Sequence, residues 1–440
     1  APLATMAPGF VLSFGAVVAL LWIAKQRSPD SDAARFSIGR ILAAMQSLAA
    51  LQLLLLCGLL PLTALLFGRV AFAAAPVNLL AVPLFSLVTV PFALLGFALD
   101  GPVRNFGDAL IDVAAQGIGL LELIIARVAA FAWSALEVPV IDGAAWLFVL
   151  LPICRVVLPP SWPCRDLGWL AILALTLHVP SPPAAGCADV RILDVGQGLA
   201  VLVRTRTSTL LYDTGPAFRS GSSAAETVIL PLLTRLRVAR LDHLVVTHGD
   251  NDHSGGTGTI LARIPVSMLH VGESLADVDA RQHRCHSGVN WQADGVEFRF
   301  LHPGPDTALT GNDASCVLQV SAGSHRLLLT GDIERQAEAR LVGRGVLQAV
   351  DIMTVPHHGS RTSSTEAFVA RVRPAVAVVT NAFGNRWGFP QPEVATRWRN
   401  SGARLLQTAD SGAISLQFCT GSGELRLQRH RPSRHRIWHE

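Results

Sequence analysis

The sequence THGDNDHSGG, residues 247–256, directly follows an apolar stretch and decides how the second half of the chain is interpreted. Two imidazoles, His248 and His253, and two carboxylates, Asp250 and Asp252, fall within six residues. A tight loop after a strand can converge side chains this close, and neutral imidazole with ionised carboxylate suits zinc or manganese. We therefore expect a metal site here. The alternative, a solvated acidic turn, fits the two histidines and the following glycines poorly.

The residues around this loop alternate short apolar stretches with turn signals. We expect strands within 188–205, 209–215, 241–248, 324–332, 350–360 and 375–381, and a helix over 224–238. Strands alternating with helices indicate an α/β fold, in which functional groups gather at the carboxyl ends of strands. Two of the expected strands end in this way, in TGD (330–332) and in PHHGS (356–360).

The composition of the chain changes near residue 188. Residues 1–188 contain nine Lys or Arg and nine Asp or Glu, whereas the rest of the 440 residues contain 27 and 23. Over the whole chain 50% of residues are hydrophobic and 15% are charged, against about 25% charged in ordinary soluble domains. This excludes a disordered chain. We expect a membrane domain at 1–180, a linker at 181–188, a soluble domain at 189–420 and a basic tail at 421–440.

The first 180 residues contain six apolar stretches: 10–24, 41–67, 76–99, 117–136, 143–158 and 167–180. The second, third and fourth reach the roughly 17–20 residues that a spanning helix needs. The third stretch contains Pro76, Pro83 and Pro91, and proline removes backbone hydrogen bonds, so this stretch is either a broken helix or a kinked one. Basic residues concentrate in the first, third and fifth loops, so six crossings would put everything after residue 180 outside the cytoplasm. Because the chain starts at Ala1 without a basic segment, we expect a fragment of a longer membrane protein, not a signal peptide.

Two resemblances to known families follow from these stretches. LLPLT (59–63) and PVNLL (76–80), with the prolines after them, resemble the competence domain of the ComEC family. That family comprises inner-membrane DNA-internalisation proteins of natural transformation. The 247–256 loop with TGD and PHHGS resembles the metallo-β-lactamase fold, an αββα sandwich. The resemblance therefore implies a polytopic α-helical membrane domain followed by an α/β hydrolase domain, in the order found in ComEC.

The hydrolase resemblance also implies a site. Two divalent metal ions, zinc or manganese, would be held by side chains from four loops: His248, Asp250, Asp252, His253, Asn312, Asp332 and His358. Asp332 would bridge the ions, Asp252, Asp332 and His357 would be catalytic, and Asp213 would brace the ligand loop. Most members have His at the positions of Asp250 and Asn312, so the first metal would be bound by more oxygen atoms and more weakly.

Other side chains are candidates for nucleic-acid contact. Arg361 and Arg386 are expected to bind phosphate or DNA, because guanidinium is planar and always charged. Trp387 would stack on a base or belong to the rim of the domain. The tail, with five arginines between residues 426 and 436, would contact nucleic acid or be simply solvated.

The ComEC resemblance implies a function in DNA uptake. The chain would form an inner-membrane channel for single-stranded DNA, with an extracytoplasmic metal-dependent nuclease that degrades the other strand of a double-stranded substrate. Its partners would be DNA, the bilayer and other competence proteins, with homo-oligomerisation left open. Two alternatives remain: a DNA-guiding transporter with an inactive hydrolase domain, and a membrane-anchored envelope phosphodiesterase with a non-DNA substrate.

The cysteines bear on the compartment. None of the seven forms a CxxC pair, and those of an external domain tend to form disulfides. We expect a bridge between Cys285 and Cys316. The strand-like VEFRFLHP lies between them and CVLQV begins at Cys316, so antiparallel pairing of these two strands would bring the thiols within reach. Unpaired thiols, or a second metal site at His283, Cys285 and His286, are the alternatives.

Overall fold

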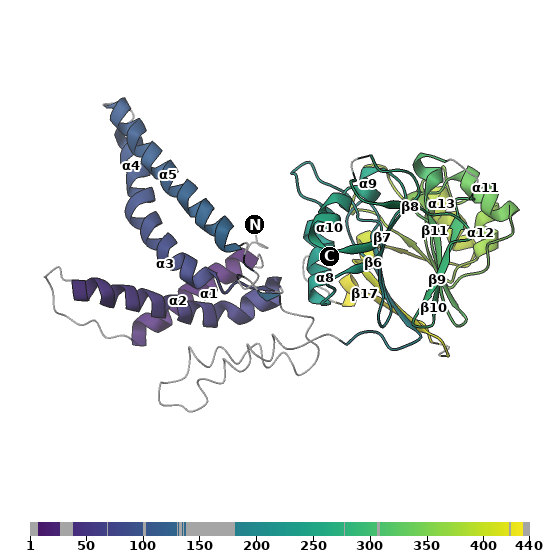
Figure 1. Ribbon diagram of the computed structural model, residues 1–440, viewed down its shortest axis with the longest axis horizontal. Helices are drawn as coiled ribbons and strands as arrows, with labels where there is room; N and C mark the ends of the chain where they lie inside the picture. The colour runs from purple at the N-terminus through teal and green to yellow at the C-terminus, as the bar shows by residue number, and fades with distance from the viewer. Residues whose placement is uncertain are drawn as a thin grey trace. The chain divides into compact units, whose positions relative to one another are not determined.

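The chain divides into two compact units, which we describe separately: unit 1, Ala1–Pro180, and unit 2, Ser181–Glu440 (Figure 1). The computed structural model describes residues 8–26, 38–67, 69–99, 103–129, 131, 134, 136–137, 181–276, 278–305, 309–421 and 424–433. The expected spans at 143–158 and 167–180 lie outside these residues, as do the loop arginines 27, 35, 155 and 165.

Unit 2 contains two mixed sheets. The eight-stranded sheet has the order β17-β16-β3-β4-β5-β6-β7-β8. Its strands are β3 (Cys187–Ile192), β4 (Val201–Arg204), β5 (Thr209–Tyr212), β6 (Leu241–Val246), β7 (Val266–Val271), β8 (Gln282–Arg284), β16 (Ile414–Cys419) and β17 (Arg426–Arg429). The seven-stranded sheet has the order β15-β14-β13-β12-β11-β10-β9. Its strands are β9 (Asn290–Ala293), β10 (Val296–His302), β11 (Val317–Ala322), β12 (His325–Leu329), β13 (Ile352–Thr354), β14 (Val376–Val379) and β15 (Arg404–Gln407).

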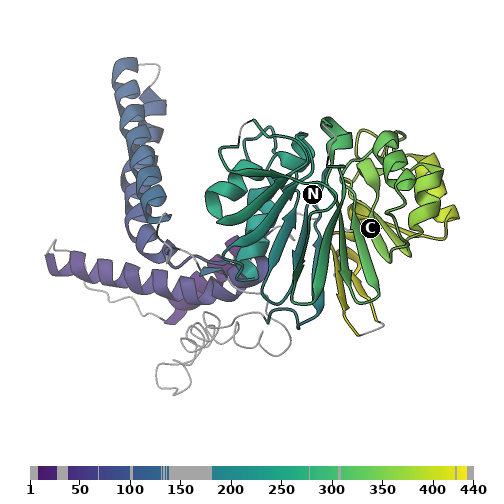
Figure 2. The same ribbon diagram turned by 45° about the vertical axis from the view of Figure 1, so that its right-hand side comes forward.

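The two sheets face each other across an apolar core, with helices on both outer faces (Figure 2). Side chains from both sheets, such as Val201 and Phe300, fill the layer between them. A second cluster packs α11 (Arg335–Gly343), α12 (Glu366–Val372) and α13 (Pro392–Asn400) on one outer face. A third packs η5 (Ala225–Ile229), α8 (Leu230–Arg235) and α10 (Thr257–Arg263) on the other. The layers are therefore those of the expected αββα sandwich.

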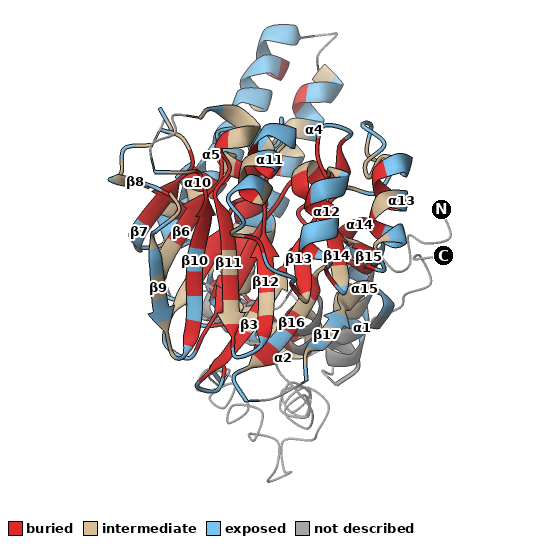
Figure 3. Ribbon diagram, turned by 90° about the vertical axis from the view of Figure 1, so that its right-hand side faces the viewer, coloured by how far each residue is buried: buried red, intermediate tan, exposed pale blue. Residues whose placement is uncertain are grey.

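Burial in the strands depends on which faces are covered (Figure 3). The central parallel strands β6 and β12–β14 are covered on both faces and are mostly buried apolar runs. Strand β10 instead alternates buried and exposed side chains along its first half, as expected when one face meets solvent. Its antiparallel pairing with β11 is the one anticipated for VEFRFLHP and CVLQV.

Two disulfides link separate segments of unit 2. Cys285 is bonded to Cys316, the pair expected from the sequence. Cys187 is bonded to Cys419 across the antiparallel strands β3 and β16, a bridge that was not expected from the sequence. Part of the segment assigned to the tail is also folded, because β17 pairs with β16 and Arg431 contacts Asp194 at 2.8 Å.

Unit 1 is helical in the residues that the structure describes, apart from the two-residue strands β1 (Arg69–Val70) and β2 (Leu136–Glu137). Its helices are α1 (Pro8–Gln26), α2 (Ile38–Phe67), α3 (Ala74–Leu84), η2 (Phe85–Thr89), α4 (Val90–Leu99) and α5 (Arg104–Ala129). Two helical segments, Ala74–Leu99 and Arg104–Ala129, are long and apolar enough to cross a membrane. They expose large apolar side chains, for example Phe97 at 78%. Two such helices are weak support for a membrane domain, and the multi-pass arrangement remains a prediction.

The third apolar stretch is a continuous helix. Helix α3 passes through Pro83 into one π-helical segment, η2, and then into α4, so the kinked-helix alternative fits better than a broken one. The fourth expected span, 117–136, was misplaced. Helix α5 starts at Arg104 and ends at Ala129. It begins before the apolar stretch because Asp108 and Asp112 interrupt the apolar pattern but not the helix.

Candidate metal centre

The side chains expected to bind metal follow the carboxyl ends of parallel strands in both sheets. Strand β5 leads to Asp213 and β6 to His248, while β12 leads to Asp332 and β13 to His358. The strands β5 and β6 are parallel neighbours, as are β12 and β13. The two sheets therefore each bring ligands to one edge, as the position of the motifs in the sequence indicated.

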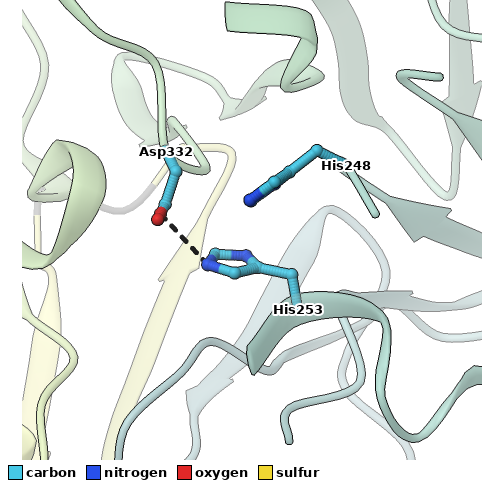
Figure 4. Close-up of side chains that lie close together, drawn as sticks. All are labelled: His248, His253 and Asp332. Atoms are coloured by element: carbon cyan, nitrogen blue, oxygen red, sulfur yellow. Dashed lines mark ion pairs between the residues drawn. The ribbon is translucent and has the colours of Figure 1, made fainter. Parts of the chain in front are cut away.

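Three of the expected ligands, His248, His253 and Asp332, converge below the protein surface (Figure 4). Both imidazoles are fully buried and Asp332 is 3% exposed. His253 Nε2 lies 3.1 Å from Asp332 Oδ1. His248 Nε2 is buried and has no hydrogen-bond partner among the residues that the structure describes. A buried imidazole nitrogen without such a partner is costly unless an ion or water completes it.

A second group shares His253 with the first and adds Asp252 and His358. His358 Nε2 lies 3.3 Å from Asp252 Oδ2, 3.5 Å from Asp332 Oδ2 and 3.3 Å from His253 Nε2. Asp332 groups with His248 and His253, while its Oδ2 lies near His358, so this carboxylate can reach side chains of both groups. The imidazole and carboxylate donors of both groups fit a divalent ion such as zinc or manganese. We call Asp252, His253 and His358 the second-metal set, and His248, Asp250 and Asn312 the first-metal set.

Electrostatics within this cluster follow from burial and pairing. Burial lowers the pKa of His253, but Asp332 and Asp213 outweigh it and raise that pKa well above the usual value. The same balance, with Asp332 and Asp252 as partners, raises the pKa of His358. Burial raises the pKa of Asp332, but His253 and His358 hold it well below the usual range. Without metal, protons on the histidines therefore balance the carboxylates.

Asp213 braces the ligand loop, as anticipated. Its carboxylate is fully buried and accepts hydrogen bonds from Thr247 N at 2.8 Å and Thr247 Oγ1 at 2.9 Å. Its Oδ2 also lies 2.8 Å from His253 Nδ1, which leaves His253 Nε2 for a metal. Thr380 Oγ1 contacts His358 Nδ1 at 3.0 Å in the same way.

The first-metal set is less complete. The Asp250 side chain is 65% exposed and its Oδ2 lies 3.5 Å from His248 Nε2. This close contact with the His248 imidazole lowers the pKa of Asp250 despite partial burial. Asn312, in η6 (Gly311–Ala314), donates its amide to Glu334 Oε1 at 3.1 Å. Its amide nitrogen is thus bonded to a carboxylate outside both ligand groups.

The turn η7 (Pro356–Gly359) directs the side chains of two adjacent histidines to different neighbours. His357 and His358 have φ of 48° and 52°, a left-handed conformation that non-glycine residues rarely adopt. The turn places His358 among the ligands, whereas His357 Nδ1 lies 3.1 Å from Glu334 Oε1 and His357 Nε2 lies 3.9 Å from Asp332 Oδ2. Such local strain concentrates at functional sites.

Two carboxylates at the site were missed from the sequence. Glu273, after β7, accepts hydrogen bonds from Gly249 N at 2.7 Å and from Gly311 N at 2.9 Å, so it ties the ligand loop to the Asn312 turn. Glu334 accepts from Asn312 and from Thr362 Oγ1 at 2.8 Å, beside His357. Both follow strand ends, the position that identified the other ligands, but neither belongs to a recognisable motif.

The two arginines expected at phosphate lie outside both ligand groups. Arg361 is exposed and its Nε lies 3.3 Å from Glu393 Oε1. The Arg386 guanidinium lies over the Trp387 ring, with its central carbon 4.3 Å from the ring centroid. A phosphate role for either requires that it leave or share these partners.

Comparisons with known proteins agree with this division of the chain. Residues 1–163 match the family model "Competence protein", and residues 193–380 match that of the metallo-β-lactamase superfamily. The chain is 35% identical to Competence protein ComA of Neisseria gonorrhoeae, over 97% of this chain and 58% of that protein. It is 31% identical to Recombination protein 2 of Haemophilus influenzae, over 84% of this chain and 50% of that protein. The chain thus spans about half the length of the curated relatives it matches.

Among solved structures, the metallo-β-lactamase fold protein YhfI of Bacillus subtilis is 13% identical, with a TM-score of 0.33 over 55% of this chain and 99% of that chain. The family models, the relatives and the αββα layers of unit 2 lead to one conclusion. The chain belongs to the ComEC-type competence proteins, with a competence domain followed by a metallo-β-lactamase domain.

Proposed function

We propose that unit 2 is a metal-dependent phosphodiesterase that cuts DNA during uptake, and that unit 1 is part of an inner-membrane channel for the strand that enters. The observation that carries the hydrolase proposal is the convergence of two imidazole–carboxylate groups on His253 and Asp332. Phosphodiester hydrolysis depends mainly on positioning and on neutralising charge, and two adjacent divalent ions supply both.

In this proposal the protein's own side chains orient the ions and move a proton. When bound, divalent ions would supply Lewis acidity toward the phosphate oxygens and the attacking water. Asp332 would hold both ions, because it groups with His248 and its Oδ2 also lies 3.5 Å from His358 Nε2. Asp252 would complete the second-metal set through its contact with His358.

His357 is the proposed proton donor to the leaving oxygen. Glu334 Oε1 lies 3.1 Å from its Nδ1 and would hold one proton there, so a second proton on Nε2 would be the one given to the leaving oxygen, returning the ring to its neutral form. Glu334 is thus a positioning residue. Its removal should lower the maximal rate while metal bound at Asp252, His253 and His358 is retained.

The test is cleavage of DNA by the full 440-residue chain in detergent, with added Mn²⁺ or Zn²⁺ and with a chelator. Metal-dependent cleavage that is lost in Asp332→Ala is the expected result. Binding of DNA without cleavage under all metal conditions would favour the second candidate, a DNA-guiding transporter with an inactive hydrolase. That candidate is supported by the exposed Asp250. Cleavage of other phosphodiesters but not DNA would favour the envelope phosphodiesterase.

We further propose that unit 2 faces the periplasm, where it would meet DNA and other competence proteins. The two disulfides support this orientation, because such bonds persist in oxidising compartments. The test is a reporter fused after Pro183, together with non-reducing peptide mapping of the purified chain. Activity of a periplasmic reporter and both bridges are expected. A reporter active only in the cytoplasm, with free thiols, would reverse the topology and the import proposal with it.

A further inference from the structure

The loop of residues 381–390 presents aromatic rings beside the metal centre. In the described part of unit 2, four large apolar side chains are exposed, and two of them, Phe383 at 84% and Trp387 at 46%, belong to this loop. Single exposed apolar residues are ordinary, but two on one loop next to a candidate active site indicate a binding surface.

The rings form a column that starts at a metal ligand. The Phe389 ring lies over that of His358, with centroids 6.4 Å apart and planes 23° apart. The Trp387 ring is in turn nearly parallel to that of Phe389, at 6.4 Å and 12°. The Arg386 guanidinium covers the Trp387 ring at 4.3 Å. Rings in similar orientation therefore lead from the buried ligand to an exposed indole.

Hydrogen bonds within the loop hold these rings in place. Asn385 Oδ1 accepts from Phe389 N, and Asn385 Nδ2 donates to Phe389 O, both at 2.8 Å. Asn381 Nδ2 donates to the same carbonyl at 2.9 Å. Gln391 N donates to Gly359 O at 2.9 Å, which anchors the loop to the turn that carries His358. A surface built in this way binds without paying for ordering of the loop.

A hollow of about 500 Å³ adjoins the loop, and Asn381, Phe383, Phe389 and Arg399 are among its lining residues. This volume is within the range of ligand-binding pockets. Asn381 is 2% exposed, and its Oδ1 has no hydrogen-bond partner among the residues described. An acceptor in this state can be satisfied by an N–H donor of a ligand. The edge of a nucleobase offers such donors.

We propose that this loop, the aromatic platform of residues 381–390, binds an unpaired nucleobase next to the phosphate that is cut. The inference rests on the proposed function, and it specifies the substrate as single-stranded or frayed DNA and not the interior of a duplex. A nucleobase can stack on an aromatic side chain only when the face of the base is free, as in a single strand or at a frayed end. The cation over the indole adds attraction toward the strand without selecting a sequence.

The experiment measures binding separately from cutting. The full chain carrying Asp332→Asn, in detergent with Mn²⁺, is titrated against a fluorescein-labelled 12-nucleotide thymidine strand and against the same strand with abasic residues. Adding Trp387→Ala should weaken binding of the normal strand about 5- to 100-fold, the range of one base stacked on an aromatic ring. Trp387→Phe should restore most of it. The abasic strand should bind equally to proteins with and without Trp387. Met268→Ala removes another exposed apolar side chain and should change nothing.

Failure of this inference and failure of the proposed function give different results. If the wild-type chain never cleaves DNA but Trp387→Ala still selectively weakens binding of the normal strand, the platform stands and the nuclease proposal falls. If the wild type cleaves DNA and Trp387→Ala binds both strands as tightly as its parent, the platform is overturned. Absence of any strand binding, or equal binding of the normal and abasic strands by the Asp332→Asn parent, would overturn it as well.

Discussion

The two halves of the candidate metal centre share the loop that follows β6, but they differ in how firmly their side chains are held. The second-metal set is buried on the His253 and His358 side, and Asp213 and Thr380 hold the far nitrogens of these histidines. In the first-metal set His248 is buried, but the Asp250 side chain is largely exposed. Preorganised ligands bind metal tightly, so the two positions are expected to differ in affinity.

The largest expected effect is the difference in DNA cleavage between loss of Asp332, which lies within the cluster, and loss of Asp250, which is exposed. Asp332→Ala removes the carboxylate that faces both histidines, and cleavage should fall by about 10³-fold or more. Asp250→Ala removes a half-exposed ligand and should cost on the order of tenfold. Initial rates at saturating Mn²⁺ measure both, with the exposed Asp279→Ala as the matched control. Similar losses in the two ligand variants would mean that the halves are equivalent.

Glu273→Gln tests whether the first-metal set depends on its brace. The amide keeps the size of the side chain but cannot accept from both Gly249 N and Gly311 N. We expect about 10- to 100-fold weaker binding at the first metal, as for other residues that support ligands, and little change at the second. Metal titration measures this, with Glu424→Gln on the exposed surface as control. An equal loss at both positions would show that Glu273 supports the whole domain.

Asn312→His should make the two halves more alike. It supplies an imidazole at the position where the metallo-β-lactamase resemblance places a ligand, and imidazole suits zinc. We expect zinc to bind the first position on the order of tenfold more tightly. Calorimetric titration with Zn²⁺ gives the comparison with wild type. Unchanged affinity would mean that the η6 turn does not bring residue 312 to the metal.

The smallest expected effect is on protons. Despite burial, their carboxylate partners raise the pKa values of His253 and His358, so each ring stays protonated to a higher pH than a free imidazole. A metal ion needs neutral imidazole, so binding at the second-metal set should release protons, and fewer as pH rises through these pKa values. Titration in buffers of different ionisation enthalpy counts them. Release that is absent at pH 7, or that grows toward pH 9, would contradict the assigned charges.

Much of the second-metal set could be predicted from the sequence, because its residues follow strand ends in recognisable motifs. His253 lies in the loop after β6, whose clustered imidazoles and carboxylates predict a metal site, whereas Asp332 and His358 were expected from the metallo-β-lactamase resemblance. Glu273 could not be found this way, because its partners Gly249 and Gly311 lie 24 and 38 residues away and are backbone amides. The Cys187–Cys419 bridge, with a sequence separation of 232, depends on the pairing of β3 with β16, which no local pattern reveals.

Local charge misled the sequence interpretation elsewhere. Asp108 and Asp112 delayed the expected start of the fourth span, although one helix, α5, includes both. The phosphate role expected for Arg386 stays a prediction, and its guanidinium lies over the Trp387 ring at 4.3 Å.

The difference between the two metal positions is tested most directly by titrating the metal-free full chain with Mn²⁺ and counting bound ions. The structure leads us to expect two unequal sites, a tight one that disappears in Asp252→Ala and one at least about tenfold weaker that is altered in Asp250→Ala. Two sites of equal affinity, or a tight site that survives Asp252→Ala, would contradict the account.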